Sequence, residues 1–380
     1  MKTIIRNFTS IFRKFVTANL LNLLGLSLAF ASFFVIMTQV NYDLGYNKSF
    51  TEHEKLFRLT MELGHGMEDY GTTLPRPLVE QLAAASPHVT SYGIKQGWTN
   101  NDQFLVDEQV YSLTLVYGIH DFISVFKPTV VDGDLKGLNQ LSNIVLPRSE
   151  AIRIFGTANA AGKTMKYYWE DNVFYNVCAV IEDYPENNLL HGACFIGVNS
   201  NEGNYQNWNY DAYIRVDDVK NLPTVLTAMR KKAIGLFKDD FNLTSPKDAD
   251  DLQVILTPVA DTHFSKDLNR NFTGAYSVSR SSVYLLICFS LLIIVIAAVN
   301  FMNFSLAETP MRIRSINTQK VLGATTASLR GSLLAEAVIV SLMAFVLAMV
   351  LVYMAHDLAC SSWCRAVSCC KTISGWRVSP

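Results

Sequence analysis

The chain has 380 residues, of which 50% are hydrophobic and 17% are charged, and its formal net charge at pH 7 is −1. A near-neutral chain this rich in apolar residues is typical of a membrane-anchored protein and speaks against soluble nucleic-acid binding. The charge is unevenly distributed, because residues 40–281 hold 21 Lys or Arg against 30 Asp or Glu, whereas residues 1–16 hold four bases and no acid. This asymmetry predicts an acidic block outside the membrane and a basic N-terminus on the cytoplasmic side.

The first 40 residues predict a membrane anchor. In residues 1–15, Ile4, Phe8 and Phe15 share a helical face opposite the bases. This pattern is typical of a cytoplasmic amphipathic helix in the headgroup region, and equally of a plain basic flank that sets orientation. Residues 16–40 then form a first transmembrane helix. A cleaved signal peptide is the alternative, but the apolar run is too long and its small-x-small triplet Ala29-Phe30-Ala31 lies inside it.

Residues 41–281 form a block large enough for one large or two small domains, with patterns that alternate between strand and helix. Strands are expected at residues 56–63, 103–116, 173–181, 210–216 and 252–259, and helices at residues 77–85, 149–155 and 219–236. The expected fold class is therefore an α+β membrane protein. A large mixed α+β extracytoplasmic domain separates its first transmembrane helix from two more.

Two further apolar runs, residues 282–304 and 332–356, are each long enough to cross the ~30 Å hydrocarbon core as a helix. The single acid between them, Glu308, is outnumbered by Arg312, Arg314, Lys320 and Arg330. This excess marks residues 305–331 as a cytoplasmic loop. The last run carries Glu336 near its cytoplasmic end. There the carboxylate either faces protein inside the membrane or reaches the interface by snorkelling.

Residues 357–380 form an atypical tail that contains four of the seven cysteines, at Cys360, Cys364, Cys369 and Cys370. A zinc site is one interpretation, but the gaps between these cysteines fit none of the common ligand patterns. A shift of reading frame near Asp357 explains the composition better. A long hydrophobic frame in register with this one in the DNA would contradict that hypothesis.

The sequence offers no catalytic constellation, so an enzyme is not expected. Residues 156–164 imitate a phosphate-binding loop, but five residues separate the glycines where the motif has four, and a helix is expected before the loop. A turn is the better interpretation. Cys178 and Cys194 could pair in an oxidising compartment, although unpaired thiols are favoured. His263 is expected to make a structural hydrogen bond.

Short motifs carry a resemblance to a known family. In the membrane part they are Val299-Asn300-Phe301-Met302-Asn303 and Ile313-Arg314-Ser315-Ile316-Asn317-Thr318-Gln319-Lys320-Val321-Leu322-Gly323-Ala324. In the outer block they are Asp121-Phe122, Gly133-Asp134, Asn143-Ile144-Val145-Leu146, Phe155-Gly156, Gly162-Lys163-Thr164, Val177-Cys178-Ala179-Val180, Asp183-Tyr184-Pro185, Leu256-Thr257-Pro258 and His263-Phe264. In this order and spacing, the chain resembles the MacB/FtsX-like permease family of ABC transporters, in the variety common in Bacteroidetes-type bacteria, over about residues 1–356. It departs from the family at Ser315-Ile316-Asn317, where many members have Glu-Ile-Gly, and in its three transmembrane helices where members have four.

The resemblance implies a permease subunit of the bacterial inner membrane, with a cytoplasmic N-terminus and a MacB-like periplasmic core domain at residues 41–281. Residues 305–331 then form a coupling loop whose short helix docks on a separate ATPase subunit. The residues expected at that contact are Arg312, Arg314, Lys320, Val321, Leu322 and Gly323. ATP is bound by the partner subunit, so this chain has no expected cofactor or metal.

The expected partners are the ABC ATPase, a second permease half or a second copy of the chain, the lipid membrane, and a periplasmic or outer-membrane protein, but no nucleic acid. Export, lipoprotein handling and mechanotransmission all fit the resemblance. Two alternatives stay open: a membrane scaffold that signals to periplasmic cell-wall hydrolases, and a truncated copy without function.

Overall fold

The computed structural model describes residues 16–62, 72–119, 122–240, 252–265, 278–307, 309–321, 323 and 325–362. The chain divides into two compact units. The membrane unit comprises Met1–Leu44 and Arg280–Pro380, and the outer unit comprises Gly45–Ser279.

The membrane unit is built from helices α2 (Val16–Leu44), α7 (Arg280–Ala307), α8 (Thr309–Val321) and α9 (Thr326–Ser362). Three of them contain segments long and apolar enough to cross a membrane, at Asn19–Leu44, Arg280–Ala307 and Thr326–Ala355. The three predicted spans are therefore confirmed. The predicted amphipathic segment at residues 1–15 and most of the cysteine-rich tail lie outside the described residues, although α9 continues into that tail as far as Ser362.

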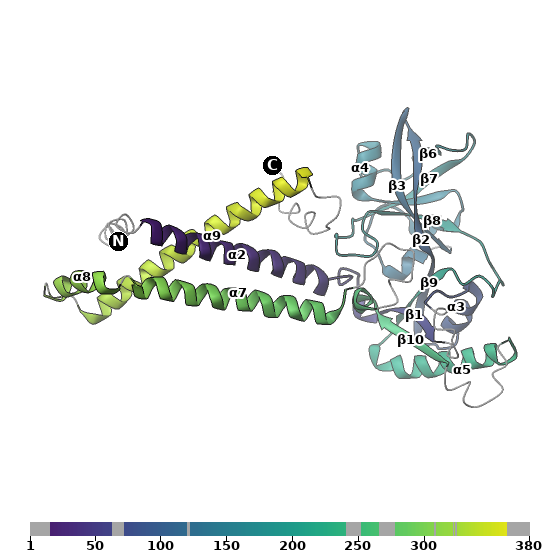
Figure 1. The fold of residues 1–380 in the computed structure, drawn as a ribbon. Coiled ribbons are helices and arrows are strands. Elements are labelled where there is room, and N and C mark those ends of the chain that lie inside the picture. Colours follow the sequence, from purple (N-terminus) through teal and green to yellow (C-terminus); the bar gives the residue numbers. More distant parts are fainter. Residues whose placement is uncertain are drawn as a thin grey trace. The chain divides into compact units, whose positions relative to one another are not determined.

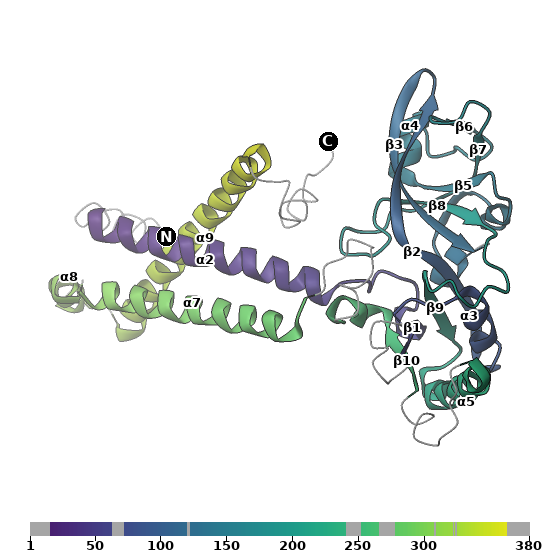
Figure 2. The same ribbon diagram turned by 45° about the vertical axis from the view of Figure 1, so that its right-hand side comes forward.

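The spanning helices pack through small residues. Ala29 of α2, Ala297 of α7 and Ala344 of α9 are buried in one cluster with Leu23 and Leu26. Alanines allow helix backbones to approach closely, which drives helix association where lipid supplies no hydrophobic force. Helices α2 and α7 run side by side in both views (Figures 1 and 2). Most other large apolar side chains on α7 and α9 are exposed, as expected of surfaces that face lipid.

The outer unit contains one mixed sheet in the part of the chain that the structure describes. Its strands are β1 (Leu56–Glu62), β2 (Val89–Val106), β3 (Gln109–Ile119), β4 (Val130–Gly133), β5 (Asn143–Pro147), β6 (Thr164–Tyr167), β7 (Phe174–Ile181), β8 (Ala193–Val198), β9 (Tyr210–Val216) and β10 (Gln253–Pro258). The strand order is β10-β1-β9-β2-β3-β8-β5-β7-β4, and β6 pairs with both β2 and β7. Helices α3 (Arg76–Ala83), α4 (Arg148–Phe155) and α5 (Leu222–Asp240) accompany the sheet, with short 3-10 helices η1 (His53–Lys55), η2 (Phe122–Phe126), η3 (Leu135–Asn139), η4 (Val219–Asn221) and η5 (Val259–Phe264).

The double pairing of β6 closes part of this sheet into a small barrel. Each strand pairs with the next around the ring β2-β3-β8-β5-β7-β6 and back to β2. The interior is filled by alternate side chains of these strands, among them Phe104, Leu115, Met165, Val177 and Ile196. Side chains in a strand alternate between faces, so one residue in two points into the barrel.

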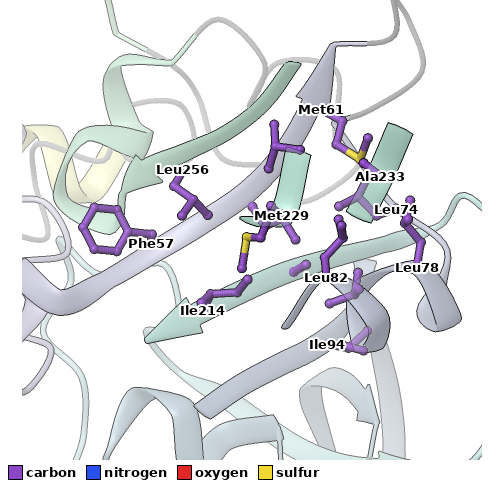
Figure 3. Close-up of a cluster of buried hydrophobic side chains, with 14 of the residues drawn as sticks. Phe57, Met61, Leu74, Leu78, Leu82, Ile94, Ile214, Met229, Ala233 and Leu256 are labelled. Atoms are coloured by element: carbon purple, nitrogen blue, oxygen red, sulfur yellow. The ribbon is translucent and has the colours of Figure 1, made fainter. Parts of the chain in front are cut away.

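The other part of the sheet, β10-β1-β9 and the first half of β2, is covered by α3 and α5. Leu78 and Leu82 of α3 and Met229 and Ala233 of α5 meet Ile214 of β9 in a buried apolar cluster (Figure 3). This cluster holds the helices against the sheet, because burial of apolar surface contributes about 25 cal/mol per Å².

The structure confirms most predicted elements and corrects one. The strand predicted at residues 103–116 is wrong, because the chain turns at Asp107 and Glu108 between β2 and β3. Both residues have positive φ, 47° and 63°, as in the turns that match hairpin twist. That conformation is usually signalled by Asn-Gly or Asp-Gly, so the Asp-Glu pair gave no turn signal. The short strands β5 and β8 were not predicted as separate elements.

A glycine in β4 provides a test of this packing. Gly133 has φ +79°, and a Cβ placed on it would lie 2.2 Å from the carbonyl oxygen of Cys178. Gly156 has a similar φ of +71° with nothing within 4 Å of such a Cβ. Gly156→Ala is expected to cost about 1–2 kcal/mol for its left-handed backbone. Gly133→Ala is expected to cost about 1–3 kcal/mol more, because backbone must move to admit the methyl group.

The thermal midpoints of both variants, followed by near-ultraviolet circular dichroism of the purified chain in detergent, test this expectation. The thermal midpoint of Gly133→Ala should lie several degrees below that of Gly156→Ala, because 1 kcal/mol corresponds to about 2–4 °C in a domain of this size. Equal midpoints would show that the contact at Gly133 is not tight.

Candidate functional site

The predicted coupling loop forms a short helix, α8, between two spanning helices. It begins at Thr309 and ends at Val321. Gly323 follows with φ +89°, and its N–H donates to the carbonyl of Lys320 at 3.0 Å. Glycine adopts this left-handed conformation without a steric penalty, which is why it commonly follows the end of a helix. The left-handed conformation of Gly323 therefore accounts for the end of α8 just before it.

The structure places the predicted contact residues of α8 unequally. Lys320 is exposed, and Val321 is 87% exposed, which is unusual for an apolar residue. Arg312 and Arg314 lie in α8, but their side chains are outside the described part of the chain, as is Leu322. The exposed Ile313, seven residues before Lys320, lies on the same side of the helix, because seven residues make about two turns. An apolar and basic surface of this kind suits contact with another protein.

Glu336 lies farther inside its helix than the apolar run suggested. Helix α9 begins at Thr326 instead of near Leu333, so Glu336 follows the helix start by about 15 Å at 1.5 Å per residue. Its side chain is half-buried. A carboxylate inside a predicted span is costly, and for that reason it marks a position of functional interest.

The outer unit contains a buried charge cluster that the sequence analysis missed. The carboxylate of Asp211 in β9 accepts from Arg58 of β1 at 3.0 Å and from Lys95 of β2 at 2.6 Å. All three side chains are at most 3% exposed. Buried charges persist only when paired, and these two ion pairs link the three neighbouring strands β1, β9 and β2. Its members are far apart in the sequence, and no local pattern joins them.

A second buried cation, Arg215 of β9, ties loops to the sheet. Its guanidinium donates to the backbone carbonyls of Val125, Glu52 and Thr51 at 2.9, 3.2 and 3.0 Å. Desolvation by burial lowers the pKa of Arg215. Nearby, hydrogen bonds from Lys127 and then Lys55 lower the pKa of the Glu52 carboxyl to about 2. These contacts are structural, because the guanidinium directs its donors at backbone carbonyls of neighbouring loops.

Two cavities adjoin this region. One, of about 510 Å³, is lined in part by the apolar residues Ile94, Ile119, Phe122 and Val125. The other, of about 450 Å³, is lined by Glu52, Lys55, Thr90, Ser91, Ser124, Lys127, Arg215, Val216 and Asp217. Its lysines are already paired with Glu52. The cavities therefore offer space without an unsatisfied charge.

The segment that imitates a phosphate-binding loop is a turn. Helix α4 ends at Phe155 before it, and strand β6 follows at Thr164, which reverses the strand-then-helix order that phosphate binding requires. The N–H of Gly162 donates to Val177 at 2.8 Å and is not available to a phosphate. The ammonium of Lys163 lies 5.0 Å from the ring centroid of Phe155.

Cys178, Cys194 and His263 have surroundings typical of residues with a structural role. Cys178 and Cys194 are free thiols. Burial raises the pKa of Cys178 to about 11 and raises that of Cys194 as well, which disfavours the reactive thiolate. His263 is buried and stacks on Tyr46 with 4.1 Å between ring centroids. Among the described residues no group of three His, Cys, Asp or Glu could hold a metal ion.

Comparisons with known proteins agree with this architecture. The MacB-like periplasmic core domain matches residues 19–232, more than half of the chain, and the FtsX-like permease C-terminal region matches residues 287–367. No curated protein matches the chain significantly.

Similar solved structures include a domain of a putative permease protein from Porphyromonas gingivalis (16% identity, 55% of this chain, 92% of that chain, TM-score 0.42). The extracellular domain of the noncanonic ABC-type transporter YknZ from Gram-positive bacteria is also similar (13%, 53%, 99%, 0.37). So is the periplasmic region of MacB from Actinobacillus actinomycetemcomitans (14%, 54%, 89%, 0.36). With its apolar helices on either side of an α+β domain, the chain belongs to the MacB/FtsX-like permease family of ABC transporters.

Proposed function

We propose that this chain couples ATP hydrolysis by a separate ATPase subunit to movement of its outer unit. The observation that carries the proposal is α8, a short helix between spanning helices α7 and α9 with exposed Lys320 and Val321. A helix between two spans that enter and leave on the same side lies outside the hydrocarbon, where a soluble subunit can reach it. The excess of bases in this loop supports a cytoplasmic position for it.

The division of labour follows from what the chain contains. Residues 156–164, which imitate a nucleotide-binding loop, follow a helix and precede a strand, the reverse of the order that phosphate binding requires. In this proposal ATP is held by the partner subunit. In this arrangement the N-terminus and α8 lie in the cytoplasm, and the outer unit lies in the periplasm. Closure of the ATPase then displaces α8, and α7 and α9 carry that displacement across the membrane.

Charge reversal on α8 tests the proposal. Arg314→Glu with Lys320→Glu is expected to abolish co-purification of the ATPase from solubilised membranes, because each substitution replaces a base that meets acidic groups on the partner. The matched control is Lys231→Glu with Lys232→Glu on α5 of the outer unit, where both lysines are exposed. It changes the net charge equally. Both double variants should insert into the membrane at wild-type levels.

The readout is the ratio of ATPase to permease after affinity purification. Loss with the α8 variant and retention with the α5 control would support coupling through α8. Unchanged co-purification in both would overturn it.

A further inference from the structure

One end of the barrel is lined by a carboxylate and three tyrosines. Asp102 of β2, Tyr117 of β3, Tyr167 of β6 and Tyr175 of β7 each lie two residues from a buried interior residue of the same strand, so all four point to the inside of the ring. Unlike the interior residues, they are partly exposed. They therefore form an open end of the barrel, called here the barrel end.

Hydrogen bonds fix the geometry of the barrel end. The Tyr117 hydroxyl donates to Oδ2 of Asp102 at 2.8 Å, and the Tyr167 hydroxyl donates to Oδ1 at 3.4 Å. The ring of Phe104 below them lies edge-on to Tyr167 and Tyr175, with centroids 5.8 and 5.6 Å apart. Each carboxylate oxygen can accept more than one hydrogen bond, so Asp102 keeps the capacity to bind a further donor.

The connection between β6 and β7 adds exposed aromatic side chains beside this end. The backbone N–H of Tyr168 donates to the carbonyl of Gln103 at 3.0 Å, which holds the connection against β2. Trp169 is 66% exposed and lies edge-on to Tyr168, and Phe174 is also exposed. Figure 2 shows β6 and β7 beside the β2–β3 hairpin. Large aromatic surfaces left in water mark sites of contact with other molecules.

The charge at the barrel end is negative. Glu170 is exposed in the β6–β7 connection, next to Trp169. Burial raises the pKa of Tyr167 and Tyr175, and the negative charges of Asp102 and Glu170 raise it further. The nearby base Lys166 is paired with Asp171 at 2.7 Å. Within the described ranges, neither Asp102 nor Glu170 has an ion-pair partner. Two carboxylates among aromatic rings attract a cation and repel an anion.

We propose that the barrel end is a docking surface for a basic segment of a second protein, with an arginine or lysine side chain seated between Asp102 and Glu170 against the aromatic rings. Arginine fits best, because its planar guanidinium can stack on a ring and donate to a carboxylate at the same time. The negative charge and the exposed aromatic surface together favour this occupant. The ATPase contact at α8 plays no part in it.

The test uses the full chain in nanodiscs of zwitterionic lipid and two fluorescein-labelled peptides, one with three arginines and one with three glutamates in the same Gly-Ser background. Fluorescence anisotropy is expected to show binding of the arginine peptide that weakens with added salt, and no binding of the glutamate peptide. Empty nanodiscs correct for contact with lipid. Asp102→Asn with Glu170→Gln should lower the affinity for the arginine peptide at least about 10-fold, given two lost charged contacts.

Matched variants make the result specific. Glu54→Gln with Glu202→Gln changes the net charge equally at two exposed acids of the outer unit and should leave the affinity unchanged. Glu170→Gln alone and Trp169→Ala leave the Asp102 hydrogen bonds intact, and each should weaken binding several-fold even if the double variant unfolds. No binding to the wild type, equal binding of both peptides, or equal loss in the Glu54 and Glu202 control would each overturn the proposal.

Discussion

Replacing Asp211 with alanine is expected to destabilise the outer unit by about 3–5 kcal/mol, because it leaves two buried cations without their anion. Arg58 and Lys95 both donate to this carboxylate, and neither is more than 3% exposed. The thermal midpoint should fall by roughly 10 °C or more. Hydrogen exchange followed by mass spectrometry should show β1, β2 and β9 opening first, since the three side chains come from these strands.

Two variants distinguish the effect of unpaired buried charge from a general loss of packing. Replacing the whole cluster, with Arg58→Met, Lys95→Met and Asp211→Leu, should recover most of the loss, because a packed apolar set needs no charge pairing. Glu182→Ala removes one side of the exposed pair with Arg148 and should cost at most about 1 kcal/mol. If the triple variant is as unstable as Asp211→Ala alone, the loss does not arise from unpaired charge.

Arg215→Met is expected to have a comparable effect by a different route. The methionine fills the space of the side-chain stem but removes the donor to the carbonyls of Thr51 and Val125, whereas the Glu52 carbonyl keeps its bond from the Lys55 N–H. An unsatisfied buried polar group costs about 1–3 kcal/mol, so a total of roughly 2–5 kcal/mol is expected for two of them. Protection from hydrogen exchange should fall in η1 and η2, the segments that these carbonyls adjoin or belong to.

Arg215→Lys separates the geometry from the charge. A lysine keeps the cation but cannot direct donors along three fixed directions, so it should recover only part of the lost stability. Arg148→Met, which removes an exposed arginine, is the matched control and should change the midpoint little. Full recovery by lysine would mean that charge alone, not the set of carbonyls, requires Arg215.

Local patterns in the sequence predicted the elements but not their assembly. The apolar runs predicted all three spans, and Pro77 and Gly156 predicted the start of α3 and the end of α4 within about a residue. The ring of strands was not predictable in this way. It depends on β6, a strand of four residues whose partners are β2 and β7. A strand this short carries little periodicity to read.

The candidate sites divide in the same manner. The end of α8 before Gly323 follows from neighbouring residues and could be predicted. The cluster at Asp211 could not, because its partners lie 153 and 116 residues away and are brought together only by strand order. The barrel end has the same origin. Asp102 has no special neighbours in the sequence, and its significance comes from tyrosines on three other strands.

Strand β2 belongs to both parts of the outer unit. Its first half pairs with β9, and its second half pairs with β3 and β6, with an irregularity in register between Lys95 and Thr99. One continuous strand of 18 residues is therefore shared by the helix-covered part of the sheet and the barrel. Any displacement of the helix-covered part would therefore reach the barrel through the backbone of β2. The strand would bend most readily at the irregular stretch between Lys95 and Thr99, next to the ion pair of Lys95 with Asp211.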